Sequence, residues 1–165
     1  MHILAIDPGS THSGFAYFRG GFLAAGGKVE NEALLVMLRT TVAEGVVLER
    51  PVSYKPGKHV DATLIWYGRF WERASDTAQV LGSMTRHQVR NYFGVSGKQA
   101  DMQIKRLLEA EREGETIAAL KGTKKNPGTL YGFVGNLDSW QALALGLAWR
   151  HHGCPAGEVT HAVPR

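Results

Sequence analysis

Cysteine is nearly absent from this sequence of 165 residues, which contains Cys154 alone. A single thiol cannot form an internal disulfide, and this favours a reducing compartment such as the cytoplasm. The sequence also lacks the C-x-x-C and H-E-x-x-H patterns of the commonest zinc sites. No apolar run approaches the roughly 20 residues that span a bilayer. The N-terminus leads directly into a predicted strand, so we expect no signal peptide.

Acidic residues are not in excess: 19 Lys and Arg stand against 15 Asp and Glu, and the isoelectric point is about 9.3. This mild bias favours polyanionic partners without identifying one. The 44% of hydrophobic residues is ordinary for a globular protein, and the length suits one domain with a core. We expect a domain over residues 1–152 and a C-terminal tail, 153–165, whose lack of periodicity is typical of a flexible segment.

The first stretch with chemical content is a short apolar run at residues 3–6, which ends in Asp7. The run has no polar alternation, as in a strand buried on both faces. Pro8-Gly9 marks a tight turn, residues 14–18 a returning strand, and residues 22–29 a third strand. This hairpin would hold the Asp7 carboxylate at the edge of a sheet. The alternative is that Asp7 only caps its own turn.

A helix over residues 30–43 then leads to a second buried strand, residues 46–48, which ends in Glu49. A right-handed crossover can place this strand parallel to the first, so that Asp7 and Glu49 lie side by side. Two such carboxylates repel each other unless a cation or a shared proton compensates. The alternative is that Glu49 pairs with Arg50 at the surface.

The other elements follow from periodicity and capping signals. They are a helix over 61–74 capped by Asp61, a fifth strand over 77–82, a helix over 86–92 capped by Thr85, and a helix over 99–113. We expect Leu64 and Ile65 among the buried residues of the first helix. On the helix over 86–92, Arg86, His87 and Arg90 are expected to be exposed. The fold class predicted is α/β, a mixed five-stranded sheet flanked by helices.

A third carboxylate, Asp138, falls in the first turn of a last helix that begins near Asn136. The helix dipole alone can explain an acid at this position. If Asp138 instead converges with Asp7 and Glu49, the three hard oxygen ligands select Mg²⁺ or Mn²⁺. Two such ions can activate water and stabilise the leaving oxygen of a phosphodiester. Gln141 lies one turn later and could face the same metal.

Several basic residues and one aromatic lie in loops around this predicted site. Such a mixture suits phosphate contact and base stacking, although a solvated basic loop is a common alternative. The candidate DNA contacts are Tyr54, Lys55, Lys58, Lys98, Lys124 and Lys125.

The sequence resembles the RuvC family of Holliday-junction resolvases in four stretches, over about residues 1–152. These read I-D-P-G-S-T-H-S-G-F-A, V-V-L-E-R-P, S-G-K-Q-A-D-M-Q-I and L-D-S-W-Q-A-L-A-L-G-L-A. The first and last are the specific ones. The resemblance implies an RNase H-like fold, a homodimer, two Mg²⁺ or Mn²⁺ ions per active site and paired nicking of four-way DNA junctions. It also implies a bacterial or phage-infected cell, or an organelle, as the setting.

By position, Asp7, Glu49 and Asp138 match three of the family's four acidic residues, and they are the expected catalytic and metal-binding residues. The fourth position holds Gln141, which either coordinates metal or only hydrogen-bonds Asp138 or DNA. Asp101 stands where the family has a basic residue, and Lys98 is close enough to substitute. The stretch K-G-T-K-K-N-P-G-T-L-Y-G is more similar to phage- or plasmid-like relatives.

Two other functional classes remain open. One is a nuclease of the same fold that acts on flaps or DNA–RNA hybrids. The other is a junction-binding protein without catalysis, if the loss of the fourth acid abolishes metal binding. An ATP-binding sugar kinase also begins with D-x-G-x-[ST], but it requires a second phosphate-binding hairpin and a longer chain.

Overall fold

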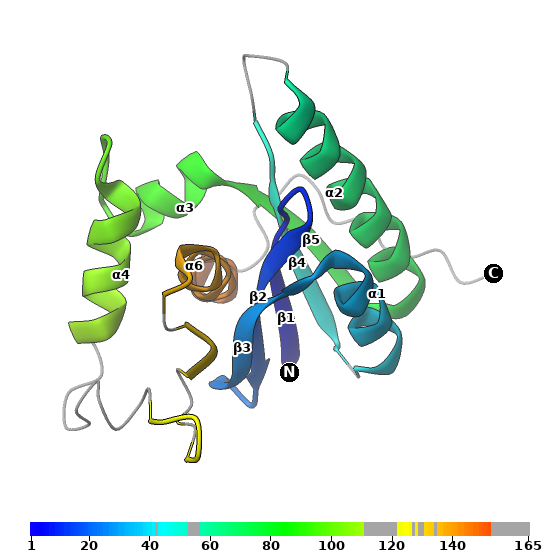
Figure 1. Cartoon of the computed structure of the whole chain (residues 1–165), viewed down its shortest axis with the longest axis horizontal. Coiled ribbons are helices and arrows are strands. Elements are labelled where there is room, and N and C mark those ends of the chain that lie inside the picture. Colours follow the sequence, from blue (N-terminus) through cyan, green and yellow to red (C-terminus); the bar gives the residue numbers. More distant parts are fainter. Residues whose placement is uncertain are drawn as a thin grey trace.

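A mixed five-stranded sheet with the order β3-β2-β1-β4-β5 runs through the centre of the chain (Figure 1). The protein is described by a computed structural model that covers residues 1–41, 43–52, 57–110, 122–126, 128, 131–133 and 135–152, apart from the side chains of residues 58, 80 and 152. The strands are β1 (His2–Asp7), β2 (His12–Arg19), β3 (Phe22–Glu30), β4 (Gly45–Arg50) and β5 (Val80–Thr85). β1, β2 and β3 pair antiparallel, whereas β4 is parallel to both β1 and β5. The predicted fold class is confirmed.

Helices cover both faces of this sheet (Figure 1). They are α1 (Asn31–Thr40), α2 (Lys58–Thr77), α3 (Arg86–Tyr92), α4 (Ala100–Ala110) and α6 (Leu137–His152), with a short 3₁₀ turn, η1, at Tyr131–Phe133. α1 and α2 pack together on one face. On the other face α6 lies across β1 and β2, with α3 and α4 packed against it. None of the described helices is long and apolar enough to cross a membrane.

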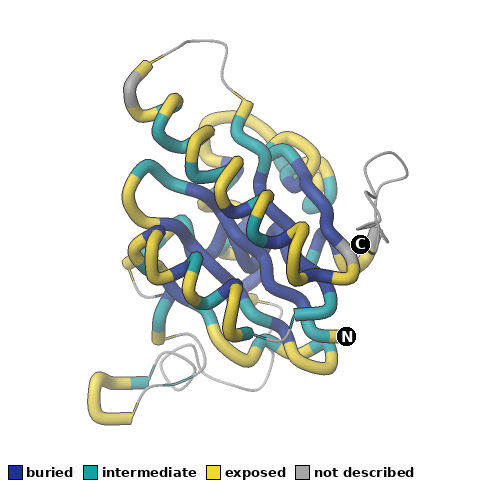
Figure 2. Tube along the Cα trace, turned by 90° about the vertical axis from the view of Figure 1, so that its right-hand side faces the viewer, coloured by how far each residue is buried: buried dark blue, intermediate teal, exposed yellow. Residues whose placement is uncertain are grey.

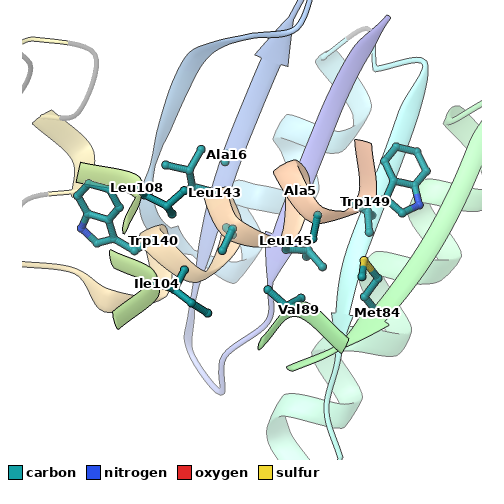
Figure 3. Close-up of a cluster of buried hydrophobic side chains, with 14 of the residues drawn as sticks. Ala5, Ala16, Met84, Val89, Ile104, Leu108, Trp140, Leu143, Leu145 and Trp149 are labelled. Carbon is teal, nitrogen blue, oxygen red and sulfur yellow. The ribbon is translucent and has the colours of Figure 1, made fainter. Parts of the chain in front are cut away.

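The alternation of side chains along β1 divides the core into two clusters. Ile3 and Ala5 belong to the cluster under α6, whereas Leu4 and Ile6 belong to the cluster under α1 and α2. Figure 3 shows the first cluster, in which α6 is packed between the sheet and α4. Because successive side chains of a strand point to opposite faces, Asp7 is directed to the α6 face. β1, β4 and α6 are largely buried, whereas most residues of β3 are exposed or half-buried. Figure 2 shows the buried residues gathered in the interior of the molecule.

The same alternation applies to β4. Val47 belongs to the cluster under α6, and Val46 and Leu48 belong to the opposite cluster. Glu49, two residues after Val47, is therefore directed to the same face of the sheet as Asp7.

The second half of the sequence shows where periodicity misplaced element boundaries. α2 begins at Lys58, after Gly57, so Asp61 is not its cap, and it continues to Thr77. Leu64 and Ile65 were predicted to be buried, but they are 45% and 63% exposed. The predicted strand over 77–82 is wrong by three residues, because β5 spans Val80–Thr85. Part of the predicted helix over 99–113, and the tail over 153–165, lie outside the described residues.

Candidate functional site

Two carboxylates lie next to each other where β1 and β4 end. The strands are parallel neighbours with Ile6 opposite Leu48, so the next residues, Asp7 and Glu49, stand at the same edge of the sheet. Both are buried, with only 7% and 6% of their surface exposed. This juxtaposition is the one that the sequence predicts. The alternative was a Glu49 at the surface, and the burial of this residue excludes it.

The cation that compensates these charges is Arg86. Its Nε donates to Glu49 Oε1 at 2.6 Å, and its Nη2 is 3.2 Å from each carboxylate oxygen of Asp7. Arg86 was predicted to be exposed, and this is wrong: only about a third of its side chain (37%) is accessible. The reason is the position of β5. Thr85 pairs with Arg50 at the end of the sheet, so Arg86 begins α3 directly beside the carboxylates.

Local sequence fixes the start of α3. The Thr85 side chain accepts from the Gln88 backbone N–H, and the Gln88 side chain accepts from the Thr85 backbone N–H at 2.7 Å. This reciprocal capping box satisfies two backbone donors of the first turn. It confirms the predicted cap and sets the direction in which Arg86 leaves the backbone.

Asp101 of α4 holds the basic side chains from the other side. It accepts from Arg90 Nε at 2.9 Å and from Arg90 Nη2 at 2.8 Å, and its Oδ2 is 3.6 Å from Arg86 Nη1. The Gln141 side chain also hydrogen-bonds to Asp101. Burial alone would raise the pKa of Asp101, but the Arg90 hydrogen bonds and the two guanidinium charges lower it. Asp101 is therefore ionised and serves as the outer anchor of Arg86 and Arg90.

Burial is the main influence on the two carboxylates at the strand ends. It raises the pKa of Asp7 well above its ordinary value, and the negative charge of Glu49 adds to this, whereas Arg86 acts in the opposite direction. Burial also raises the pKa of Glu49, against the lowering effect of Arg86. For Arg86, burial lowers the pKa, but the charges of Glu49 and Asp7 outweigh it and raise the pKa overall. The site thus combines two costly buried anions with one fixed cation.

Asp138 lies in the first turn of α6, as predicted. Its Oδ2 is 2.6 Å from Lys28 Nζ of β3, and its side chain is 44% exposed. Its negative charge contributes to the raised pKa of Asp7, so the three acids share one electrostatic environment. The close approach of α6 depends on Gly14, the residue opposite Asp7 in β2, because a Cβ there would lie 2.2 Å from the Asp138 carbonyl oxygen.

A buried polar network holds the turn that follows Asp7. The Gly9 backbone N–H donates to Ser13 Oγ at 3.1 Å, and Ser13 Oγ donates to Asn31 Oδ1 at 2.6 Å. Asn31 Nδ2 in turn donates to the Gly9 carbonyl at 3.0 Å. Asn31 is 1% exposed. From the sequence, Asn31 is placed only within the predicted helix over residues 30–43, and its role in this turn was missed.

A pocket of about 850 Å³ opens over Asp7 and Glu49. Its rim combines basic residues from three segments, among them Arg50 at the end of β4, His59 of α2 and Arg90 of α3. Of the predicted DNA contacts, Lys58 is the first residue of α2, and Lys98, Lys124 and Lys125 are exposed. Tyr54 and Lys55 lie outside the described residues.

The donor chemistry of the site suits a hard divalent cation. Asp7, Glu49 and Asp138 provide carboxylate oxygens, which Mg²⁺ and Mn²⁺ prefer. Among the described residues, Glu49 Oε2 is a buried acceptor without a hydrogen-bond partner. However, the described residues contain no group of three or more His, Cys, Asp or Glu side chains that could hold a metal ion as they stand. Arg86 and Lys28 are bonded to these acids instead.

Comparison with known proteins gives a likeness of fold. No family model and no curated protein matches the chain. Among solved structures, Thermus thermophilus RuvC in complex with a Holliday junction substrate matches with a TM-score of 0.59 and 15% identity, over 93% of this chain and 96% of that one. Another structure of Thermus thermophilus RuvC matches with a TM-score of 0.58 and 18% identity, over 93% and 97% of the two chains. The chain therefore has the RNase H-like fold of RuvC, as its sequence predicts.

Proposed function

We propose that this protein is a structure-selective endonuclease that resolves four-way DNA junctions by metal-dependent hydrolysis of phosphodiesters. The observation that carries the proposal is the buried pair Asp7 and Glu49 at the floor of a pocket with a basic rim. An anionic floor suits a divalent cation, and a basic rim suits the phosphates of a nucleic acid. The likeness of fold to a RuvC–junction complex favours branched DNA as the substrate.

Asp7, Glu49 and Asp138 would hold the metal, with Gln141 as a neutral fourth ligand. Held there, two such ions would supply Lewis-acid chemistry, namely activation of the attacking water and stabilisation of the leaving oxygen of the phosphodiester. Other residues of the chain keep the parts of the site in position. The network of Ser13 and Asn31 fixes the turn after Asp7. Asp101 keeps Arg90 at the rim of the pocket, where a guanidinium can hold a phosphate.

The predicted DNA contacts Tyr54, Lys55, Lys58, Lys98, Lys124 and Lys125 extend this surface. Lysines contact phosphates and set affinity, whereas a tyrosine stacks on opened bases at the centre of a junction. We expect the lysines to contribute to binding of every branched DNA, because phosphate contacts carry no sequence information.

Resolution requires two symmetric cuts, and a two-fold homodimer supplies two sites related by that symmetry. The exposed Leu64 and Ile65 on α2 support the proposal that this helix contributes to the dimer interface. Sedimentation at micromolar concentration, with and without DNA, tests it. A monomer under both conditions would contradict it.

The decisive experiment is a nicking assay on a four-way junction, a flap, a DNA–RNA hybrid and a linear duplex. Wild-type protein should nick the junction in Mg²⁺ or Mn²⁺ and be inactive in EDTA. Asp7→Asn, Glu49→Gln and Asp138→Asn should each lose cleavage and retain junction binding, because the phosphate contacts lie elsewhere. Full activity in one variant would remove that residue from the site. Preferred cleavage of the flap or the hybrid would instead favour another nuclease of this fold.

A junction-binding protein without catalysis is the second candidate. The observation in its favour is that Arg86 and Lys28 already pair with all three acids. Tight junction binding that Mg²⁺ does not alter, together with the absence of nicking on every substrate, would establish this alternative.

A further inference from the structure

Arg86 makes an unusual set of contacts for a residue on the rim of an acidic pocket. Its Nε, Nη1 and Nη2 each face a different carboxylate, those of Glu49, Asp101 and Asp7 in that order. The two inner carboxylates are almost fully buried. A planar guanidinium with this geometry can satisfy several acceptors at once, which an ammonium cannot do.

The side chain of Arg86 is held in place by contacts with other parts of the fold. The capping box of Thr85 and Gln88 fixes the first turn of α3. Asp101, itself held by two hydrogen bonds to Arg90, fixes the outer edge of the guanidinium. The inner edge lies against Glu49 at 2.6 Å. Arg86 therefore stands directly at the oxygens with which Asp7 and Glu49 would bind a cation.

The charges explain why this matters. When both carboxylates are ionised, Asp7 and Glu49 carry two negative charges and Arg86 contributes one positive charge, so one negative charge remains on the pair. Gln141 adds none, and Asp138 has its own partner in Lys28. The electrostatic attraction for a divalent cation is therefore much weaker at this site than at three free carboxylates. In addition, the guanidinium already contacts both carboxylate oxygens of Asp7 and one of Glu49, so these oxygens are not free to coordinate the cation.

We propose that Arg86 is a built-in counter-cation of the Asp7–Glu49 pair that competes with divalent metal for these carboxylates. This inference rests on the proposed function in that it takes the acids as the metal site. In the free protein Arg86 stabilises the buried anions. A metal ion must displace its Nε and Nη2 from them before it can use the same oxygens. Glu49 Oε2, which has no hydrogen-bond partner among the described residues, is the oxygen still available to an arriving ion.

The first test measures Mn²⁺ binding by calorimetry in the absence of DNA. Arg86→Gln removes the charge but keeps a polar side chain, and it should bind Mn²⁺ at least tenfold more tightly than wild type. Arg86→Lys should show a smaller gain, because an ammonium keeps the charge but cannot contact the carboxylates as a fork. Arg106→Gln is the matched control, since it removes the same charge from an exposed position on α4, and its affinity should equal that of wild type. Affinity in Arg86→Gln that is no tighter than in wild type would overturn the proposal.

A second measurement needs no variant and guards against misfolding of Arg86→Gln. In ¹⁵N-labelled wild-type protein, the Nε–H resonance of Arg86 should shift or exchange with water as Mg²⁺ saturates the site, whereas that of Arg90 should remain. An unchanged Arg86 resonance at saturating Mg²⁺ would also overturn the competition. Both measurements are independent of nicking.

The two proposals can therefore fail separately. If Arg86→Gln binds metal more tightly but wild type does not nick DNA, only the proposed function is refuted. If wild type nicks DNA but Arg86→Gln binds metal no more tightly than wild type, only this inference is refuted.

Discussion

Lys28 Nζ lies 2.6 Å from Asp138 Oδ2, so the third acid of the site has a cation partner that comes from the far end of β3. Both side chains are partly exposed, at 36% and 44%. Exposed pairs of this kind contribute about 0.2–1 kcal/mol to stability. The pair is therefore more important for the charge of the site than for the free energy of unfolding.

We predict that Lys28→Gln lowers the free energy of unfolding by less than about 1 kcal/mol in urea titrations. The same variant should bind Mn²⁺ more tightly than wild type, because Asp138 loses its competitor. Arg19→Gln, at the exposed end of β2, is the control for the loss of one positive charge. Equal Mn²⁺ affinity in Lys28→Gln and in wild type would separate Asp138 from the metal site.

The turn after Asp7 should be sensitive to the amide of Asn31. Asn31→Ala leaves the Ser13 hydroxyl and the Gly9 carbonyl without their buried partner, and each unsatisfied group costs about 1–3 kcal/mol. We expect a clear loss of stability by urea denaturation. Glu32→Ala, one residue further on α1, removes only an exposed ion pair with Arg69 and should be nearly neutral. Equal stability of the two variants would show that the network does not hold the turn.

Gly14 and Gly68 provide a matched test of close packing at the site. A Cβ at Gly14 would meet the Asp138 backbone, whereas a Cβ at Gly68 in α2 would meet nothing within 4 Å. Gly14→Ala should therefore destabilise the fold and move the N-terminus of α6 away from Asp7. Gly68→Ala should be neutral, or stabilising by up to about 1 kcal/mol, because alanine is the better helix former. Thermal melting of both variants decides this, and a neutral Gly14→Ala would mean that α6 can shift freely.

The adjacency of Asp7 and Glu49 was predictable because it depends on local rules. Each residue follows a short buried strand, and a right-handed crossover makes these strands neighbours. The position of Arg86 depends instead on where β5 ends. Because the predicted strand ended three residues too early, Arg86 was predicted to face the solvent instead of the edge of the sheet. α2 continues to Thr77, so the first residue predicted for the fifth strand belongs to this helix. The fully buried residues of α2 are Phe70 and Ala74 instead of Leu64 and Ile65.

No local sequence pattern predicts the contacts between elements that are distant in the chain. Lys28 with Asp138 joins β3 to α6, and Asp101 with Gln141 joins α4 to α6. Neither pair has a sequence spacing that indicates contact. The sequence did contain a usable signal for Asp101, because an acid stands there where the resemblance implies a base. Two arginines on the preceding helix, four residues apart, were its available partners.

The basic loop with Lys124 and Lys125 offers a prediction about DNA affinity. Both residues are exposed, and the loss of one phosphate contact reduces the magnitude of the slope of log affinity against log salt by about one. A Lys124/Lys125 double alanine variant should therefore reduce the slope by about two on a four-way junction. Fluorescence anisotropy over a range of NaCl concentrations measures it, with a Lys105/Arg106 double alanine variant on α4 as the charge-matched control. An unchanged slope would locate this loop away from DNA.

Gln141 is the position where metal binding and stability can be separated most clearly. Its side chain is 4% exposed and hydrogen-bonds to Asp101. Gln141→Asp would place a second carboxylate against Asp101 and close to the buried acids, so the metal-free variant should melt at a lower temperature than wild type. If position 141 lies in the metal shell, the same change adds an anionic ligand.

Saturating Mn²⁺ should then raise the melting temperature of Gln141→Asp by more than that of wild type, and the variant should nick a junction at a lower metal concentration. Gln141→Leu should need more metal, or lose cleavage, because it offers no oxygen. Asp101→Asn, alone and combined with Gln141→Asp, is the control: the single variant measures the lost contacts of Asp101 with Arg86 and Arg90. Adding Gln141→Asp to it should lower the metal-free melting temperature by less than adding Gln141→Asp to wild type, because the repulsion is gone. Equal Mn²⁺ shifts in wild type, Gln141→Asp and Gln141→Leu would place position 141 outside the metal shell, with its amide serving only to hold Asp101.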